Sequence, residues 1–174
     1  MRLPPLFLLL ALTSVCRADA ALSRLETADA CIISGDRHIQ LQVELAKTPE
    51  QRHQGLMERS ELEADSGMLF LYPQPRDSST YFWMYRTWIP LDIAFLSDQG
   101  QILRIRHMKP CHSPNPDMCR HYRAGAQFSA ALEMRADYFQ DHRIETGDVF
   151  QLQGNAAGPL AHPDKRCQQP EDSR

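Results

Sequence analysis

The cysteine content, in a chain that begins like an exported protein, constrains this fold more than any other feature of the sequence. The chain has 174 residues and five cysteines. An apolar run over 6–15 is followed by Ala18-Asp19-Ala20, the small-x-small pattern of a signal-peptidase site. We therefore expect 1–20 to be a signal peptide. The mature protein then begins near Ala21 and is exported to the periplasm or the extracellular space.

Two other readings of the N-terminus stay open. Cys16 could carry a lipid, as in lipoproteins, although Val15 stands before it where that reading needs a small residue. The apolar run could also remain as an uncleaved anchor. It has only about ten residues, whereas a membrane-spanning helix needs roughly 20. No later segment is long enough, so we expect no transmembrane segment in the mature chain.

Removal of the signal leaves four cysteines, an even number that suits a disulfide framework in an exported chain. Three pairings are possible. We favour Cys111–Cys119, which closes a loop with two prolines, and Cys31–Cys167, which ties together the two ends of the mature domain. In the loop-closure picture the short bridge contributes about 2–3 kcal/mol and the long one about 5 kcal/mol.

The charge of the chain argues against a nucleic-acid partner. It has 19 basic and 22 acidic residues, and the signal takes away Arg2, Arg17 and Asp19. The mature protein therefore stays net negative. It shows no basic run and no interleaving of basic and aromatic residues, whereas nucleic-acid backbones require a positive surface.

The hydrophobic pattern predicts short strands and two short helical pieces. Residues 38–45 alternate polar and apolar, with Ile39, Leu41, Val43 and Leu45 facing inward. Thr48, Pro49 and Gln51 form the capping box of a short helix that ends near Gly55. Further strands are expected at 67–72, 81–84, 91–96, 102–106, 127–134 and 149–152, with a turn at 98–101 and a short helix over 136–142.

About seven short strands predict a mainly β fold of the α+β class, a small curled sheet or β-barrel-like domain with one or two short helices. We expect a loose N-terminal leader over 21–35, the folded domain over 36–153 and a C-terminal tail over 154–174.

Four stretches of the sequence resemble the bacterial and archaeal family named domain of unknown function 192, or uncharacterised protein family 0127. They are T-P-E-Q-R-H-Q-G-L-M (48–57), G-M-L-F (67–70), F-W-M-Y-R-T-W-I-P-L-D-I-A-F (82–95) and G-D-V (147–149). The resemblance covers roughly 36–153. It implies a compact β-barrel-like domain with a short helix, often exported, and no established activity.

The chain departs from the pattern of that family at two places. Members commonly have Lys-Asn before the Thr of the long block, where this chain has Tyr85-Arg86. Many also have a Gly soon after an L-E-L-like strand, whereas Arg135-Ala136-Asp137 follows Leu132-Glu133-Met134 here.

Asp92 is the candidate for chemistry, because it lies between Leu91 and Ile93 in an apolar strand. A buried carboxylate needs a partner, and we expect Arg86 or Thr87 to supply it. In the functional interpretation Asp92 is a general acid or base, or a ligand anchor, in a pocket lined by Trp83 and Trp88. In the structural interpretation, which we favour, Asp92 holds the 86–90 turn.

The segment 107–121 is rich in potential metal ligands. His107, His112 and His121 could hold zinc or copper together with the cysteines between them. Their spacing matches no standard zinc pattern, and disulfide-bonded cysteines do not ligate. We therefore favour a disulfide loop with solvated histidines, and we expect neither a metal nor another cofactor.

The sequence favours a non-catalytic binding module for a small molecule or an envelope component. The residues expected to contact the ligand are Trp83, Arg86, Thr87, Trp88 and Asp92. The first alternative is a hydrolase that uses Asp92 with a His or Arg. The second is a structural or assembly factor of the cell envelope. The sequence shows no nucleophile elbow, phosphate loop or dinucleotide fingerprint.

Overall fold

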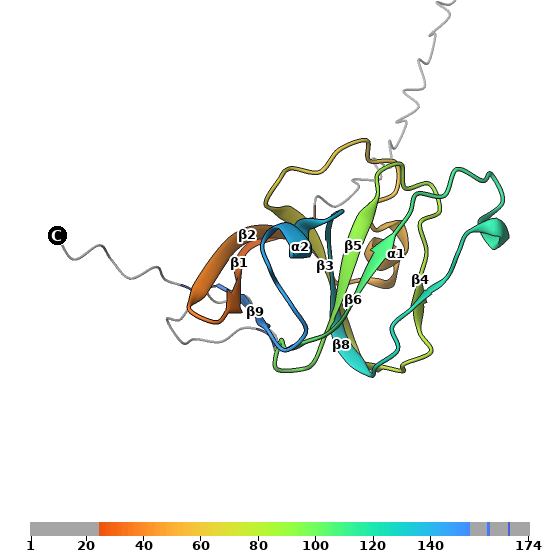
Figure 1. The fold of residues 1–174 in the computed structure, drawn as a ribbon. Coiled ribbons are helices and arrows are strands. Elements are labelled where there is room, and N and C mark those ends of the chain that lie inside the picture. Colours follow the sequence, from red (N-terminus) through yellow and green to blue (C-terminus); the bar gives the residue numbers. More distant parts are fainter. Residues whose placement is uncertain (1–24, 154–159, 161–166, 168–174) are drawn as a thin grey trace, which may run out of the picture.

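A seven-stranded mixed sheet forms the body of the protein (Figure 1). The computed structural model describes residues 25–153, Leu160 and Cys167. The predicted signal peptide over 1–20 and most of the predicted tail over 154–174 lie outside the described residues. Within the part of the chain that the structure describes, no helix is long and apolar enough to cross a membrane.

The strands of the large sheet lie in the order β6-β5-β8-β3-β2-β1-β9. They are β1 (Glu26–Ser34), β2 (Arg37–Ala46), β3 (Ser66–Arg76), β5 (Leu91–Leu96), β6 (Ile102–Met108), β8 (Phe128–Arg135) and β9 (Val149–Leu152). Only β2 and β3 pair in parallel, and the other neighbours are antiparallel. Strands β4 (Tyr81–Phe82) and β7 (Tyr122–Arg123) form a separate two-stranded sheet.

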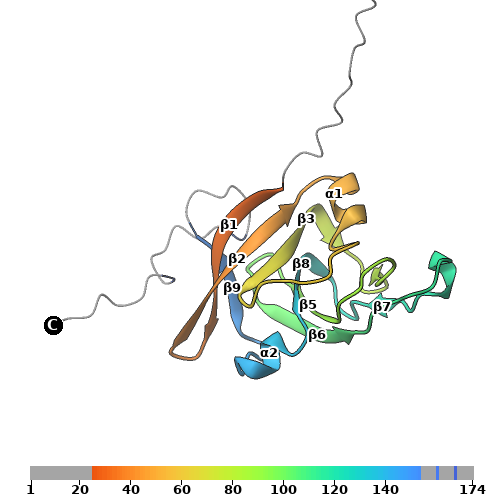
Figure 2. The same ribbon diagram turned by 90° about the horizontal axis from the view of Figure 1, so that it is seen from above.

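Two short α-helices lie on opposite sides of the sheet (Figures 1 and 2). Helix α1 (Pro49–Gln54) belongs to the connection between the parallel strands β2 and β3. It has the predicted capping box, in which Thr48 accepts from the backbone of Gln51 and the Gln51 side chain accepts from the backbone of Thr48. Helix α2 (Tyr138–Asp141) follows β8. A 3-10 helix, η1 (Pro116–Met118), lies in the connection between β6 and β7.

Each face of the sheet carries its own apolar cluster. The first cluster joins β1, β2, β8 and β9 to α2 through residues such as Ile32, Leu132 and Tyr138. The second cluster lies under α1 and the small sheet and includes Phe70 and Phe95. Alternation along β8 places Leu132 and Met134 in the first cluster and Ala131 in the second.

Both disulfides form in the favoured pairing. Cys111 and Cys119 are bonded across eight positions, and Cys31 is bonded to Cys167 across 136 positions. Leu160 is also buried, and its carbonyl accepts a hydrogen bond from Leu152. Two residues of the predicted tail therefore pack against the domain.

The predicted leader over 21–35 is wrong for the residues of β1. This strand pairs with β2 along nine residues and with β9 on its other side, so it lies inside the sheet. The predicted strand over 81–84 is shorter than expected, because pairing with β7 ends at Phe82.

The sheet is curled but not closed into a barrel. Its two edge strands, β6 and β9, approach each other at a single bridge between Gln101 and Val149. Hydrogen bonds connect them there, from Phe150 to Gly100 and from Ile102 to Asp148. The contact then ends, because β9 has four residues and is already paired along its length with β1.

Gly100 allows this approach of the two edges, and replacing it should destabilise the fold. Its φ is +80°, and a Cβ there would lie 2.1 Å from the Phe150 carbonyl oxygen. Gly35, with φ +58°, has open space around it and serves as a matched control. We expect Gly100→Ala to cost about 2–4 kcal/mol, from backbone strain plus overpacking, and Gly35→Ala about 1 kcal/mol, from strain alone. Urea unfolding measures both, and equal losses would contradict the close approach.

Candidate functional site

Glu133 is an ionisable residue in the middle of the sheet. Its side chain is 4 % exposed and lies on β8, directly between Met68 on β3 and Ile93 on β5. Both neighbours belong to the second apolar cluster. Among residues 25–153, no side chain donates a hydrogen bond or forms an ion pair with the Glu133 carboxyl. Glu133 was predicted only as part of a strand and not as a site residue.

The Glu133 carboxyl lies at a small cup of about 30 Å³, which holds about one water-sized group. The cup is lined by the end of α1 and the turn after it, by Phe70 and Phe82 of the second cluster, and by Trp83 and Thr87. Three of the four stretches that carry the family resemblance therefore meet around Glu133. They come from distant parts of the chain, so only the folded protein brings them together.

The local sequence explains why α1 packs so closely over this cup. Helix α1 ends at Gly55, whose φ is +48° and whose Cβ position lies 3.4 Å from the Phe70 ring. Arg52 donates to the Leu71 carbonyl at 2.9 Å and stacks over the Tyr72 ring at 4.9 Å. These contacts fix the helix end on β3 and form one wall of the cup.

Gly67 has the corresponding role between the strands. A Cβ at this position would lie 2.5 Å from the Glu133 carbonyl oxygen and 2.3 Å from the sulfur of Met134. The absence of a side chain at Gly67 therefore allows β3 to pair closely with β8 next to Glu133.

Burial controls the protonation of Glu133. Desolvation raises the pKa of its carboxyl to about 8, because burial disfavours the charged form. The group is therefore mostly protonated at neutral pH, and it can donate a hydrogen bond into the cup. Burial also raises the pKa of Tyr72 to about 12, against the opposing effect of Arg52 and Arg76.

A short row of aromatic rings lies beside the cup. The His53 and Trp83 ring centroids are 6.2 Å apart, and those of Trp83 and Tyr85 are 5.7 Å apart. All three rings are at least partly accessible to solvent. Such a row gives a ligand an apolar surface next to a single buried polar group, the usual composition of a small-molecule site.

Asp92 is buried as predicted, with 6 % exposure, but its partner is not the predicted one. Its Oδ1 lies 2.8 Å from Nδ1 of His107, the residue directly opposite on β6. Burial raises the pKa of Asp92, and the hydrogen bond from His107 and the backbone N–H of Asp137 oppose that rise. Asp92 faces α2, on the side of the sheet opposite Glu133.

The prediction that Arg86 pairs with Asp92 is wrong. Arg86 forms an exposed ion pair with Glu58, and its backbone φ is +54°. That left-handed conformation favours Gly and Asn, so the Asn that the family commonly has at this position suits the backbone without any role in a site. Thr87 is buried at the cup, whereas Trp88 is exposed and stacks on His112.

The predicted metal ligands do not converge. Cys111 and Cys119 are bonded to each other, His112 stacks on Trp88, and His121 stacks on Tyr81 with 3.8 Å between centroids. Within the described residues, one group has three donors that could share an ion. It consists of Asp92, His107 and Asp137, whose ligand atoms all lie within 4.8 Å of one another.

Two larger depressions lie beside the middle of β2. They measure about 650 and 440 Å³ and share Gln42, Glu63 and Ser66 in their walls. Both are open and polar, and neither contains an ionisable group that is buried away from water. We therefore place the candidate site at the smaller cup, because the buried carboxyl of Glu133 lies there.

The family model of domain of unknown function 192 (DUF192), described as "Uncharacterized ACR", matches residues 31–152. A solved structure from Sinorhizobium meliloti, described as a proposed transcription regulator, is 30% identical with a TM-score of 0.66, covering 74% of this chain and 95% of that one. A protein of unknown function from Novosphingobium aromaticivorans is 27% identical with a TM-score of 0.66, covering 75% and 89%. No curated protein matches the chain.

The protonation of Glu133 should appear in the pH dependence of stability. Its folded pKa of about 8 lies above the model value of 4.5. The stability that it contributes is therefore present below about pH 4.5 and is lost as pH rises toward 8, at up to about 1.4 kcal/mol per pH unit. Glu133→Gln should remove this slope, whereas the exposed control Glu145→Gln should keep it. Urea unfolding between about pH 5 and 8 measures the slope, and identical slopes for wild type and Glu133→Gln would contradict the assignment.

Proposed function

Because the chain belongs to the domain of unknown function 192 family, and the stretches that identify that family surround Glu133, we propose that it is a non-catalytic binding module. The ligand is a small molecule, or a group of an envelope component, that places one polar group in the Glu133 cup. The observation that carries this proposal is the buried carboxyl, which has no hydrogen-bond partner among the described residues and lies at a cavity. The two disulfides and the predicted signal support export to the periplasm or the extracellular space.

The chemistry of the cup indicates which ligands it can take. A space of about 30 Å³ admits one group the size of a water molecule, such as a hydroxyl or an ammonium. A protonated Glu133 donates a hydrogen bond to a hydroxyl or carbonyl, whereas an ammonium would draw the proton off and pair with the carboxylate. The rest of the ligand then lies on Trp83 and its neighbouring rings, outside the cup.

A thermal-shift screen of the full chain tests this proposal. The probes are N-acetylglucosamine, glycerol 3-phosphate and ethanolamine. Together these small molecules present a carbonyl, hydroxyls and an ammonium group. We expect at least one of them to raise the Tm by about 2 °C or more at a concentration well above its Kd. Glu133→Met removes the polar group while keeping most of its volume, and an apolar side chain of similar size avoids the cost of burying a polar group that lacks a hydrogen bond.

Glu133→Met should therefore abolish the shift without lowering the basal Tm, and Glu145→Gln should leave both unchanged. A shift that survives in Glu133→Met would place the ligand elsewhere. If none of the three probes stabilises the wild type, the cup is not a site for these classes of ligand, and the binding proposal fails for them.

A second candidate function is a hydrolase centred on Asp92 and His107. The observation that favours it is their 2.8 Å contact, in which a buried carboxylate holds the ring of a half-exposed histidine. This is the arrangement by which a carboxylate orients a general base. No serine or free thiol among the described side chains hydrogen-bonds to His107, so this base would activate water.

Turnover of p-nitrophenyl acetate and p-nitrophenyl phosphate separates the two functions. If the protein is a hydrolase, the wild type should hydrolyse one of these substrates faster than buffer alone. Asp92→Asn should lower that rate by about 100-fold or more, because His107 is then no longer oriented as a base. Glu133→Met should keep full turnover, since it lies on the other face of the sheet. Activity that persists in Asp92→Asn, or wild-type rates equal to buffer, would rule out the hydrolase for these substrates.

A further inference from the structure

The loop closed by the Cys111–Cys119 disulfide projects from the body of the protein. Figures 1 and 2 show η1, at the tip of this loop, standing clear of both sheets in two perpendicular views. The loop belongs neither to the Glu133 cup nor to the Asp92–His107 pair, so those sites do not explain it.

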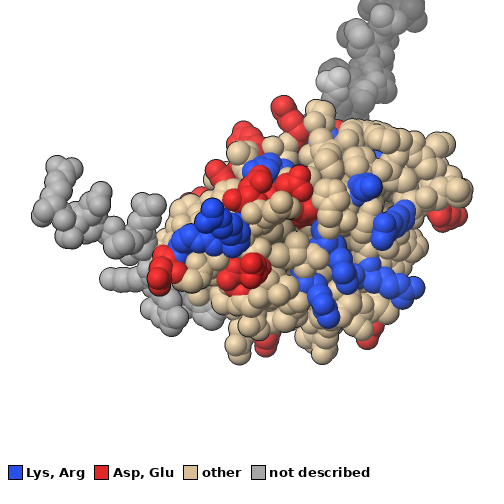
Figure 3. Space-filling view, in the orientation of Figure 1, with Lys and Arg blue, Asp and Glu red and all other residues tan. Residues whose placement is uncertain are grey.

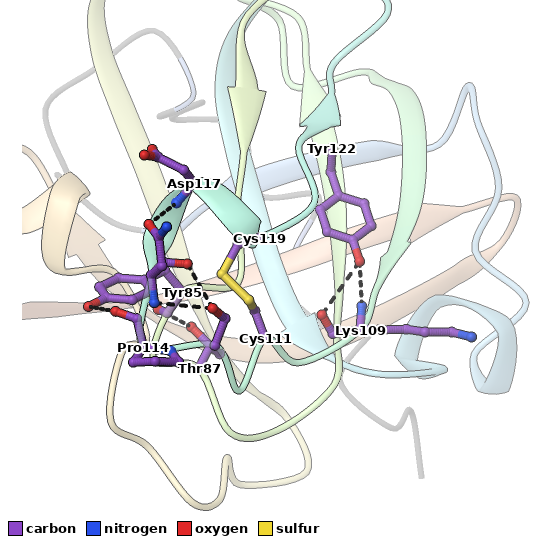
Figure 4. Close-up of a disulfide and its surroundings, with 10 residues drawn as sticks. Tyr85, Thr87, Lys109, Cys111, Pro114, Asp117, Cys119 and Tyr122 are labelled. Carbon is purple, nitrogen blue, oxygen red and sulfur yellow. Dashed lines mark hydrogen bonds between the residues drawn. A yellow bond between two sulfur atoms is a disulfide. The ribbon is translucent and has the colours of Figure 1, made fainter.

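The loop is rigid rather than loose. Its base is fixed to the 84–85 segment, because the N–H of Cys111 donates to the Met84 carbonyl at 3.3 Å. Tyr85 donates from its hydroxyl to the Pro114 carbonyl at 3.4 Å (Figure 4). Within the loop, Asn115 caps η1 by accepting from the N–H of Asp117 at 3.0 Å. The conformation is therefore set before any partner binds, which lowers the entropic cost of binding.

All the exposed large hydrophobic side chains of the described chain gather around this loop. They are Met118 at 74 % exposure, Tyr81 at 48 % and Trp88 at 44 %. Met118 is the last residue of η1, Trp88 stacks on His112 inside the loop, and Tyr81 stacks on His121 just after it. Apolar side chains that cluster in this way at one projecting end indicate a surface that meets a partner.

The same end of the molecule is positively charged. Lys109 and Arg120 flank the disulfide in the sequence. The Tyr122 hydroxyl accepts from the backbone N–H of Lys109, and the Arg120 guanidinium lies over the Tyr122 ring. Arg104, Arg106 and Arg123 are exposed nearby on β6 and β7, and Arg106 reaches Gly125. None of these five forms an ion pair with another described residue. Asp117 is the one acidic residue in 103–125.

Figure 3 shows the same separation of charge on one face of the molecule. Lys and Arg predominate on the right half of this view, on the side of β6 and η1, and acidic side chains gather toward α2. The linear sequence has a negative net charge and contains no run of basic residues. The positive surface forms only where β6, the loop and β7 come together.

We propose that this end of the protein, the Cys111–Cys119 loop with its flanking cations, docks on the surface of an anionic phospholipid bilayer. Met118 and Trp88 would enter the boundary between head groups and acyl chains, and Lys109 and Arg120 would contact lipid phosphates. A nucleic acid would also attract the cations. However, a nucleic acid would not account for the exposure of Met118, the most exposed apolar side chain, because methionine does not donate a hydrogen bond to a phosphate or a base edge. Burial in the lipid interface accounts for both the charges and the exposed apolar groups.

Co-sedimentation of the full chain with vesicles tests this proposal. We expect binding to vesicles of phosphatidylcholine with phosphatidylglycerol, weak binding to phosphatidylcholine alone, and loss of binding at high salt. Lys109→Glu/Arg120→Glu should lower the partition coefficient by about 10-fold or more. Met118→Ser should lower it several-fold at the same net charge. Arg143→Glu makes the same change of charge per residue beside α2, at the other end of the molecule, and should leave binding within about twofold.

Fluorescence separates docking by the loop from any contact made by the apolar residues 6–15. The chain has two tryptophans, Trp83 and Trp88. In the Trp83→Phe protein, brominated phosphatidylglycerol should quench Trp88, and the quenching should fall in the triple variant that also carries Lys109→Glu and Arg120→Glu. Circular dichroism and the Tm of each variant show that it is folded.

Three results would overturn the proposal. The first is a decrease in the logarithm of the partition coefficient in Arg143→Glu that is half or more of the decrease in Lys109→Glu/Arg120→Glu. Arg143→Glu changes the charge half as much, so this result would indicate attraction by net charge only. The second is vesicle binding without quenching of Trp88. The third is tighter binding to a 30-base-pair duplex DNA than to the anionic vesicles at equal salt, which would identify a nucleic acid as the partner of this surface.

Discussion

A buried carboxyl group in the middle of a sheet, with no hydrogen-bond partner among the described residues, is the constraint around which this structure is organised. Strand β8 pairs with a neighbour on both sides, so Glu133 lies in the interior of the sheet. Apolar residues of the second cluster lie on either side of it. An ionised carboxylate in such a place is very costly, and the group responds by keeping its proton. A protonated acid still needs a hydrogen bond, and the cup beside it gives space for a ligand to supply one.

The protein handles its two buried carboxylates in different ways. Asp92 lies on the other face of the same sheet and obtains a partner, because the β5–β6 hairpin brings His107 directly opposite. Glu133 obtains none within the described chain. The chain thus pairs Asp92 across a hairpin and leaves Glu133 at a cavity. The proposed ligand would bring the polar group that Glu133 lacks among the described residues.

Much of the fold can be predicted from local patterns. The strands 91–96 and 149–152, the capping box of α1 and both disulfides agree with the structure. These features depend on neighbours in sequence or on the small number of possible pairings. Local sequence patterns could not show whether the sheet closes into a barrel, because closure depends on whether the two edge strands pair. Here they meet at one bridge. Strand β1 was missed because its sequence, E-T-A-D-A-C-I-I-S, lacks the alternation that marks a half-buried strand.

The candidate site was harder to predict than the fold. The true partner of Asp92 was within reach, since a turn at 98–101 sets which residues of the hairpin face each other. Proximity in sequence favoured Arg86 instead, and its left-handed backbone directs it toward Glu58. The Glu133 cup draws on α1, β3, the 82–87 segment and β8, which are up to 81 positions apart. No spacing rule joins them. The positive, apolar end of the molecule likewise forms only when β6, the disulfide loop and β7 assemble.

The cup is built around the buried carboxyl of Glu133, and carbon NMR measures the protonation of that group directly. Selective labelling of the glutamate side-chain carboxyls, with the Glu133 signal assigned by its absence in Glu133→Gln, follows that group through a pH titration. We predict a midpoint near the pKa of about 8 that burial gives Glu133, well above the usual range of glutamates. A midpoint near 4.5 would show that the carboxyl is solvated or already paired, and would contradict both the buried acid and the cup built around it.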